Sequence, residues 1–344
     1  MSVLEQEGMY VYRRSPWAFF VALCIIAATA CGGSSAPKQT GPQLFANPNN
    51  PLTSVVTSWS HAGRHADAKA LQTVAATPAG VWAAGQSGDI REIAAYSAQA
   101  TRAHKVGLVV AYNLPYRDSC GKYSSNDKTK GRAYRTWIDH LATAVGSSND
   151  IVVVEPDAVS DIVSNCLNKA QVSSRYELLQ YAMQTLGKLP HAQVYLDAGN
   201  PGMSTPSKAA SFVQVLAAAL VRAGVYYGKG FSANVSNFQQ TDVTVAWAQW
   251  LEKSLGHSMR AVIDTSRNGN GPYVSTTKLS GPDWCNPPGR SLGARPTLTT
   301  GQAGIAGYLW VKDPGVSDGA CNGGPEAGQL WPQYAVGLAQ GNSP

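Results

Sequence analysis

Seven short apolar runs along the chain predict the strands of one sheet. The clearest is Ile151 to Val154, four branched residues in succession, which is typical of a strand buried on both faces. Pro156 ends this strand, because proline has no N–H group to donate to a sheet ladder. The predicted strands span residues 79–84, 106–112, 151–154, 193–196, 230–235, 261–263 and 307–311.

Between these runs, apolar residues recur at helical spacing and predict amphipathic helices. The best-defined apolar faces are Tyr134, Ile138, Leu141 and Val145, then Leu179, Met183 and Leu186, then Phe212, Leu216 and Leu220. We expect the second of these helices to begin at the capping pair Ser174 and Glu177, and the third to end at Gly224. Strands that alternate with helices indicate an α/β protein with a parallel sheet. Because no G-x-G-x-x-G follows the first strand, we predict that the seven strands close into a TIM-like β/α barrel in a single domain rather than form a dinucleotide-binding open sheet.

Polar and aromatic residues stand immediately after each predicted strand. In a parallel β/α fold the carboxyl ends of the strands face one rim, where ligands bind. The groups that follow the seven runs are Trp82, the stretch 112–118, Asp157, Asp197, Asn234 with Asn237, Asp264 with Arg267 and Asn268, and the stretch 312–318. Carboxylates, amides and aromatic rings together suit acid–base cleavage of a polar, uncharged substrate such as a sugar polymer.

The first 31 residues resemble an export signal. Arg13 and Arg14 precede an apolar segment, Trp17 to Ala28, that is short for a membrane span. Small residues then lead to Cys31, as at the cleavage site of a bacterial lipoprotein, so we expect Cys31 to be lipidated. Two alternatives are ordinary signal-peptide cleavage near Ala30, without a lipid, and an uncleaved segment that stays as a membrane anchor. We expect residues 32–51 to be a flexible linker and residues 52–344 to form one catalytic domain that works as a monomer.

Charge and cysteine usage narrow the classes of function. The net charge of +6 is spread along the chain without a basic run, which argues against nucleic-acid binding. The six histidines are scattered, and neither they nor the cysteines suggest a metal; no cofactor is expected. Export implies an oxidising compartment, and Cys24 lies in the signal. The order of the remaining four cysteines favours the pairs Cys120–Cys166 and Cys285–Cys321 among the three pairings that four cysteines allow.

Seven segments, in order along the chain, are similar to glycoside hydrolase family 6. They are 112–120 (YNLPYRDSC), 154–158 (VEPDA), 195–199 (YLDAG), 234–238 (NVSNF), 263–269 (IDTSRNG), 283–287 (DWCNP) and 309–319 (LWVKDPGVSDG). The resemblance covers roughly residues 78–341. It implies an inverting β-1,4-glucanase on a distorted seven-stranded β/α barrel.

The resemblance also implies roles for four carboxylates. Asp157 would donate the proton to the glycosidic oxygen, and Asp118 would raise the pKa of that acid and help to position water. Asp318 would be the base, acting through a chain of water molecules, and Asp197 would support the donor electrostatically. Asp118 has a second interpretation as the ion-pair partner of Arg117. Asp157, taken alone, could equally cap a helix.

The same resemblance implies the groups that contact the sugar. Trp82 and Trp284 would stack on glucose units, and Tyr112 would press on the distorted sugar at the cleavage point. Ser125, Asn234 and Lys312 would bond hydroxyl groups, and Arg117 is a further predicted substrate-binding residue. Asp264 is expected to bond its own loop through Arg267 and Asn268. Each disulfide would hold one catalytic loop.

Three departures from the family pattern concern the substrate subsites. Val316 stands where a glutamate is usual, Asn200 where a histidine is usual and Met203 where a tryptophan is usual. Ser119 also separates Asp118 from the cysteine that normally follows directly. Three functions remain open: an endo-acting β-1,4-glucanase, a weakly active or inactive glucan-binding protein of the envelope, and a hydrolase of another β-glucan. The chain has no long insertions near residues 284–312 or after Cys321 that could cover the substrate groove and turn it into a tunnel. An open groove favours cleavage of internal bonds.

Overall fold

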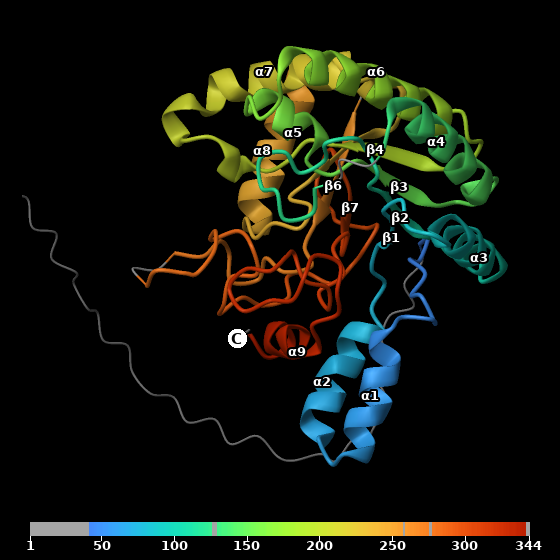
Figure 1. The fold of residues 1–344 in the computed structure, drawn as a ribbon, viewed down its shortest axis with the longest axis vertical. Coiled ribbons are helices and arrows are strands. Elements are labelled where there is room, and N and C mark those ends of the chain that lie inside the picture. Colours follow the sequence, from blue (N-terminus) through green and yellow to red (C-terminus); the bar gives the residue numbers. More distant parts are fainter. Residues whose placement is uncertain (1–40, 126–128, 257–258, 275–276, 342–344) are drawn as a thin grey trace, which may run out of the picture. The chain divides into compact units, whose positions relative to one another are not determined.

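The computed structural model describes residues 41–341 except 126–128, 257–258 and 275–276. The predicted signal and Cys31 therefore lie outside the described residues. Seven parallel strands pair in chain order, from β1 to β7, and form one curled sheet (Figure 1). Their bounds are β1 Val81–Ala83, β2 Leu108–Ala111, β3 Ile151–Val154, β4 Gln193–Asp197, β5 Gly230–Ala233, β6 Arg260–Asp264 and β7 Ile305–Leu309. The predicted seven-stranded parallel β/α fold is confirmed.

Both faces of the sheet are buried, which explains the unbroken apolar runs. In β3, Val152 and Val154 belong to the layer under the helices, whereas Ile151 and Val153 belong to the cluster inside the curled sheet. Neighbouring strands stay in register, so that Val153 lies beside Val110 of β2. The interior is therefore a packed core, and ligands can reach only its ends.

The sheet closes only partly into a barrel. Among the described residues, β1 and β7 share no ladder, but the backbone N–H of Gly80 donates to Trp310 O at 2.9 Å. A Cβ atom at position 80 would lie 2.3 Å from Val311 O, so only glycine allows this approach. The indole Nε1 of Trp82 adds a second link to Val311 O at 2.9 Å. These two hydrogen bonds form a narrow seam between the start of β1 and the segment after β7.

Helices follow the strands and cover the outer side of the sheet, as Figure 1 shows for α4, α6, α7 and α8. Their bounds are α1 Leu52–His61, α2 His65–Ala75, α3 Asp89–Arg102, α4 Gly131–Val145, α5 Ala158–Val163, α6 Lys169–Leu186, α7 Ala209–Arg222, α8 Thr241–Ser254 and α9 Pro332–Gln340. The four predicted core residues of α4 are all buried. No helix of the described ranges combines the length and apolarity that crossing a bilayer requires.

One predicted helix start is wrong. α6 begins at Lys169, and its cap is Asn168, whose side chain accepts the Gln171 N–H while Gln171 bonds back to the Asn168 N–H. Ser174 and Glu177 lie inside the helix instead. Two capping signatures follow one another here, and the earlier one opens the helix because its reciprocal pair of hydrogen bonds satisfies the first free N–H groups.

The domain starts earlier than residue 52. Leu44 is buried and pairs in parallel with Val106, and the Phe45 N–H donates to Val106 O at 2.8 Å. Part of the predicted linker, at Leu44 and Phe45, therefore pairs with the chain just before β2 and belongs to the folded domain. Next to it, α1 and α2 pack with α9 around a buried cluster that includes Leu52, Leu71 and Trp310.

Candidate functional site

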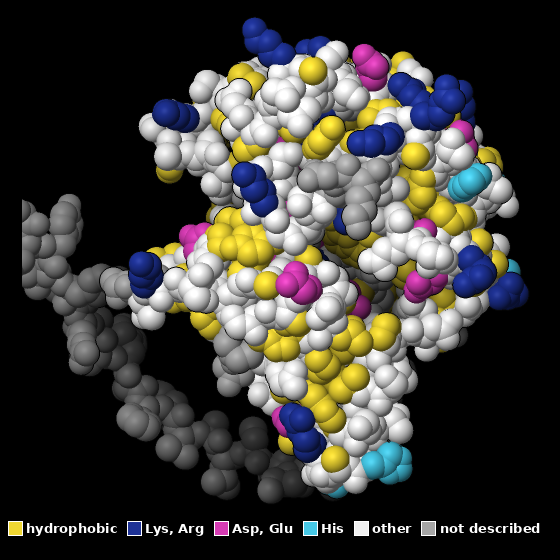
Figure 2. All heavy atoms as spheres, viewed as in Figure 1, with side chains coloured by type: hydrophobic (Ala, Val, Ile, Leu, Met, Phe, Trp, Pro, Cys, Tyr) yellow, Lys and Arg dark blue, Asp and Glu magenta, His cyan; other side chains and the backbone are white. Residues whose placement is uncertain are grey.

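A cleft of about 1410 Å³ opens at the carboxyl ends of the strands, and Figure 2 shows a hollow on this face of the protein. It is larger than a typical small-molecule site of roughly 300–1,000 Å³, as a polymer substrate requires. The cleft brings together nine predicted residues: Trp82, Tyr112, Arg117, Asp118, Ser125, Asp157, Trp284, Lys312 and Asp318. The three departures Asn200, Met203 and Val316 also line it, so they alter the substrate-facing surface.

Asp157 projects into the cleft at the turn between β3 and α5. Its φ of +69° places it in the left-handed region, and its side chain makes no helix-capping hydrogen bond, so the interpretation as a helix cap is wrong. Burial raises the pKa of Asp157 well above its usual range, and the neighbouring carboxylates of Asp197, Asp118 and Asp161 raise it further. The cation of Arg175 opposes them only in part. The raised pKa favours the protonated form of this carboxyl group, which is the form that a general acid needs.

Asp197 lies beneath Asp157 and outside the cleft lining. Its carboxylate accepts hydrogen bonds from the backbone N–H groups of Asp157 and Gly199, both at 3.1 Å, and from Ser232 Oγ at 2.9 Å. Burial raises the pKa of Asp197 to about 7 despite these three bonds. Asp197 thus contacts the backbone of Asp157 directly, a position from which it can act on the acid electrostatically.

Asp118 belongs to the loop that follows β2. Its Oδ2 accepts the Ser124 N–H at 2.7 Å and the Ser124 hydroxyl at 3.1 Å, and that hydroxyl is 2.9 Å from Tyr112 Oη. Arg117 does not pair with Asp118. Its guanidinium donates to backbone oxygens of Ala84, Tyr112 and Ser124. The ion-pair interpretation of Asp118 is therefore wrong, and Arg117 holds the loop together while it lines the cleft.

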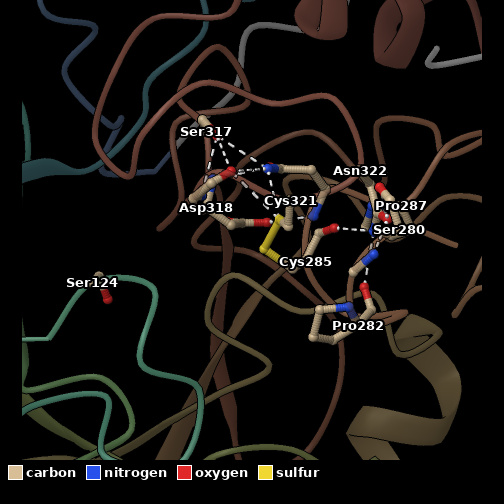
Figure 3. The surroundings of a disulfide bond; sticks show 12 residues. Ser124, Ser280, Pro282, Cys285, Pro287, Ser317, Asp318, Cys321 and Asn322 are labelled. Carbon is tan, nitrogen blue, oxygen red and sulfur yellow. Dashed lines mark hydrogen bonds between the residues drawn. A yellow bond between two sulfur atoms is a disulfide. The ribbon is translucent and has the colours of Figure 1, made fainter.

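Asp318 is held as a carboxylate by two cations. The Arg267 guanidinium binds both of its oxygens, at 2.8 and 3.0 Å, and Lys312 Nζ lies 3.1 Å from Oδ1. The Asn286 N–H adds a bond to Oδ2 at 3.1 Å. Burial alone would raise the pKa of Asp318, but Arg267 and Lys312 outweigh it and hold that pKa below its usual value. Figure 3 shows Asp318 and Ser317 beside the disulfide of Cys285 and Cys321.

Both predicted disulfides are present, Cys120–Cys166 and Cys285–Cys321. The first joins the loop of Asp118 to the segment after α5, and the second joins the loop of Trp284 to the loop of Asp318. Each therefore braces a loop that carries a cleft residue. Stable disulfides also indicate that the chain works in an oxidising compartment outside the cytoplasm.

Aromatic rings line the cleft. Trp82 and Tyr112 meet edge to face, with centroids 5.3 Å apart, and Lys312 Nζ lies 5.9 Å from the Trp82 ring. Trp284 is 38% exposed and leans edge-on against Tyr123 at 5.7 Å. An exposed, braced ring of this kind offers a flat apolar face to a sugar.

Asn234 is not available to the substrate, which corrects the prediction. Its side chain is fully buried, donates to Gln239 O and Asp264 O, and accepts the Gln239 N–H. The chain turns this side chain inward at a φ of +65°, so it closes its own loop. Ser236 and Asn237, which follow it, line the cleft instead.

Asp264 is structural, as predicted, but through different partners. Its buried carboxylate accepts the backbone N–H groups of Ser236, Ser266 and Lys312 at 2.9–3.0 Å. It thereby fixes the strand end that presents Lys312 to the cleft.

Three further residues shape the site and were not predicted. Glu155 accepts the N–H groups of Asn113 and Leu114, and burial raises its pKa to about 7. Asp161 and Arg175 form a buried ion pair at 2.9 Å beside the loop of Asp118. The spacing of Asp161, one helical turn after Asp157, is a signal that could have identified it, whereas nothing local singles out Arg175.

Comparisons with known proteins agree with this geometry. The model of glycosyl hydrolases family 6 matches residues 39–342. Endoglucanase A of Cellulomonas fimi is 37% identical over 85% of this chain, which spans 60% of that protein. Endoglucanase 1 of Streptomyces halstedii is 33% identical over 93% of this chain and 97% of its own length. The solved structure of the endoglucanase Cel6 from Mycobacterium tuberculosis, in complex with a methyl-cellobiosyl thio-cellobioside, has a TM-score of 0.76 and 36% identity, over 88% of this chain and 98% of that one.

Proposed function

The chain belongs to the glycosyl hydrolases of family 6, and we propose that it hydrolyses internal β-1,4-glucosidic bonds of cellulose or a related β-glucan with inversion of configuration. The observation that carries this proposal is the contrast between two carboxyl groups of one cleft. Burial and neighbouring carboxylates raise the pKa of Asp157, whereas Arg267 and Lys312 lower the pKa of Asp318. Environments that separate the pKa values of two carboxyl groups mark an acid and a base.

Asp157 is the general acid. It lies just after β3, it lines the cleft, and its raised pKa favours the protonated form that a proton donor needs. The glycosidic oxygen receives that proton as the bond to the anomeric carbon breaks. The carboxylates of Asp118 and Asp197 then stabilise the positive charge that develops on the sugar ring.

Asp318 is the base, and its ion pairs define how it acts. A carboxylate with a lowered pKa is a weak base, so it takes its proton late and through water rather than by direct contact with the nucleophile. Inversion leaves room for such a water, because it requires carboxyl groups about 6.5–9.5 Å apart. Asp118, whose Oδ2 is fixed by Ser124, orients the attacking water.

The substrate lies along the aromatic rings of the cleft. Trp82 and Trp284 stack on glucose units, and Tyr112 stands between them at the cleavage point. Ser125 and Lys312 bond hydroxyl groups. Val316, Asn200 and Met203 replace polar and aromatic groups with smaller or less polar ones, which favours soluble or mixed-linkage glucans over crystalline cellulose.

The alternative of an inactive glucan-binding protein is not favoured. The curated bacterial relatives at 33–37% identity are named endoglucanases, and this chain has the four carboxylates of the proposed mechanism.

Reducing-sugar release from carboxymethylcellulose and from mixed-linkage β-glucan tests the proposal. Wild-type protein should release sugar and lower the viscosity early, as internal cleavage does, and NMR should show the α-anomer first. Asp157→Asn should lose at least about a thousandfold in kcat while it still binds cello-oligosaccharides. Asp67→Asn, in an exposed ion pair of α2, is the matched control and should remain fully active. Unchanged turnover of Asp157→Asn would refute the assignment.

We also propose that the chain is exported, anchored to the cell envelope through a lipid on Cys31, and monomeric. The small residues before Cys31 support the anchor. Mass spectrometry of the mature N-terminus tests signal removal and the lipid anchor, and the molar mass from light scattering tests the monomeric state. An unmodified mature chain that starts near residue 31 would remove the anchor.

A further inference from the structure

We propose that Asp161 and Arg175 form a positioning pair that holds the loop of Asp118 against the helix that begins after Asp157. The inference rests on the proposed function, because it concerns how the acid and its neighbour are held together. Neither residue is assigned to the acid, the base or a sugar contact.

The loop after β2 needs outside support. Tyr116 and Asp118 both have positive φ values, 56° and 52°, in the left-handed region that costs free energy for residues other than glycine. Ser119 stands between Asp118 and Cys120 in this loop. A loop with this strain keeps one conformation only where its surroundings impose it.

Asp161 imposes that conformation on one side. One carboxylate oxygen, Oδ2, accepts the Ser119 N–H at 2.9 Å, and the other accepts the Cys120 N–H at 3.2 Å. These are the two peptide groups directly after Asp118. The side chain of Asp161 comes from α5, the helix that Asp157 precedes, so one carboxylate ties the two parts of the site together.

Arg175 completes the link from α6. Its Nη1 donates to Asp161 Oδ2 at 2.9 Å and to Ala158 O at 3.2 Å. Its Nη2 donates to Pro115 O and Tyr116 O, before Asp118. The guanidinium thus spans the residue after Asp157 and the residues before Asp118.

General stabilisation of the fold does not explain this pair well. The two side chains are only 2% and 3% exposed, and the desolvation of two buried charges offsets most of their attraction. The disulfide Cys120–Cys166 already tethers the same loop. What the pair adds is orientation, because it fixes four peptide groups on both sides of Asp118.

The pair also acts on the charge balance of the acid. The groups around Asp157 are Asp197 from β4, Asp118 from its loop, Asp161 from α5 and Arg175 from α6. Asp161 raises the pKa of Asp157 and Arg175 lowers it. Removal of one partner or the other should therefore shift the pH profile in opposite directions, which a purely structural role would not do.

The experiment compares Asp161→Asn, Arg175→Met and the double variant with wild-type protein. We expect kcat on mixed-linkage glucan to fall at least tenfold in each single variant, with less than a twofold change in KM, because the aromatic subsites are intact. The alkaline limb of kcat/KM should move to lower pH in Asp161→Asn and to higher pH in Arg175→Met. Arg175→Lys keeps the positive charge but not the planar guanidinium with its several N–H donors. It should therefore have a kcat between those of Arg175→Met and the wild type.

Three controls separate this idea from misfolding and from failure of the proposed function. The double variant removes both charges, so it should fold with wild-type thermal stability and keep the low kcat. Asp67→Asn, in the exposed pair with Arg64, should change nothing. Amide hydrogen exchange at Ser119 and Cys120 should accelerate at least tenfold in Asp161→Asn, whether or not any glucan is a substrate. Unchanged exchange, or wild-type kcat and pH profile in folded Asp161→Asn, would overturn the inference.

Discussion

The backbone N–H of Asp157 donates to the carboxylate of Asp197 at 3.1 Å. The residue proposed as the general acid is therefore in direct contact with a second, buried carboxyl group. The pKa of Asp197 is raised to about 7, and its ionised form raises the pKa of Asp157. The charge on Asp197 therefore favours the protonated form of Asp157, the form that can act as a proton donor.

Replacement of Asp197 by asparagine should move the alkaline limb of kcat/KM to lower pH. The amide carries no negative charge, so the pKa of Asp157 falls and the proton is lost at a lower pH. The effect should be largest above about pH 7, where Asp197 would otherwise be ionised. Initial rates on mixed-linkage glucan across the acidic, neutral and mildly alkaline range measure it. If the alkaline limb of kcat/KM stays at the wild-type pH, the carboxyl groups of Asp197 and Asp157 do not interact.

Glu155 should make the protein less stable as the pH rises from about 4 to about 7. Its folded pKa of about 7 lies above the unfolded value, so the folded state binds the extra proton, and that stabilisation is lost as the pH rises through this window. The expected loss is about 3 kcal/mol in the free energy of unfolding. Urea unfolding at several pH values measures it, and Glu155→Gln should flatten the profile by that amount.

Asp318→Asn should cost both activity and stability. It leaves the buried cations of Arg267 and Lys312 without their carboxylate, and breaking a buried ion pair costs about 3–5 kcal/mol. Thermal unfolding measures this loss, with Asp67→Asn as the exposed-pair control, where less than about 1 kcal/mol is expected. Azide should restore part of the lost turnover, since a small anion can replace a nucleophile that needed base assistance. A variant as stable as the wild type would contradict the ion-pair assignment.

Trp284→Ala should raise KM about tenfold, which corresponds to about 1.4 kcal/mol of lost stacking, with a small effect on kcat. Trp250 is a matched control, because it is also 38% exposed but lies on α8 outside the cleft lining. Trp250→Ala should leave KM unchanged. Michaelis–Menten analysis on a soluble glucan compares them, and equal KM values in both variants would remove Trp284 from the substrate site.

Sequence patterns predicted an element correctly where residues close together in the chain determine that element. The branched run Ile151–Val154 is β3 with the predicted bounds, because four residues that must be buried on both faces have few other places in a β/α fold. The start of α6 was missed because Asn168 and Ser174 both carry a capping signature, and only the folded helix selects between them. Asn234 was misplaced because a backbone turn, which the residue type does not reveal, directs its side chain inward.

The sequence by itself determined that carboxylates and aromatic rings follow the strands of a parallel sheet, and therefore that they meet at one rim. The family resemblance already implied that Asp157 is the proton donor and Asp318 the base, but only the tertiary structure shows what makes their pKa values differ. Asp157 and Asp318 are the same residue type, each in a segment that follows a strand, yet their pKa values shift in opposite directions. The physical reason is that desolvation and Coulomb interactions depend on distances in space: Asp157 is surrounded by carboxylates from three other segments, and Asp318 by two cations, one of them 51 residues away in the chain.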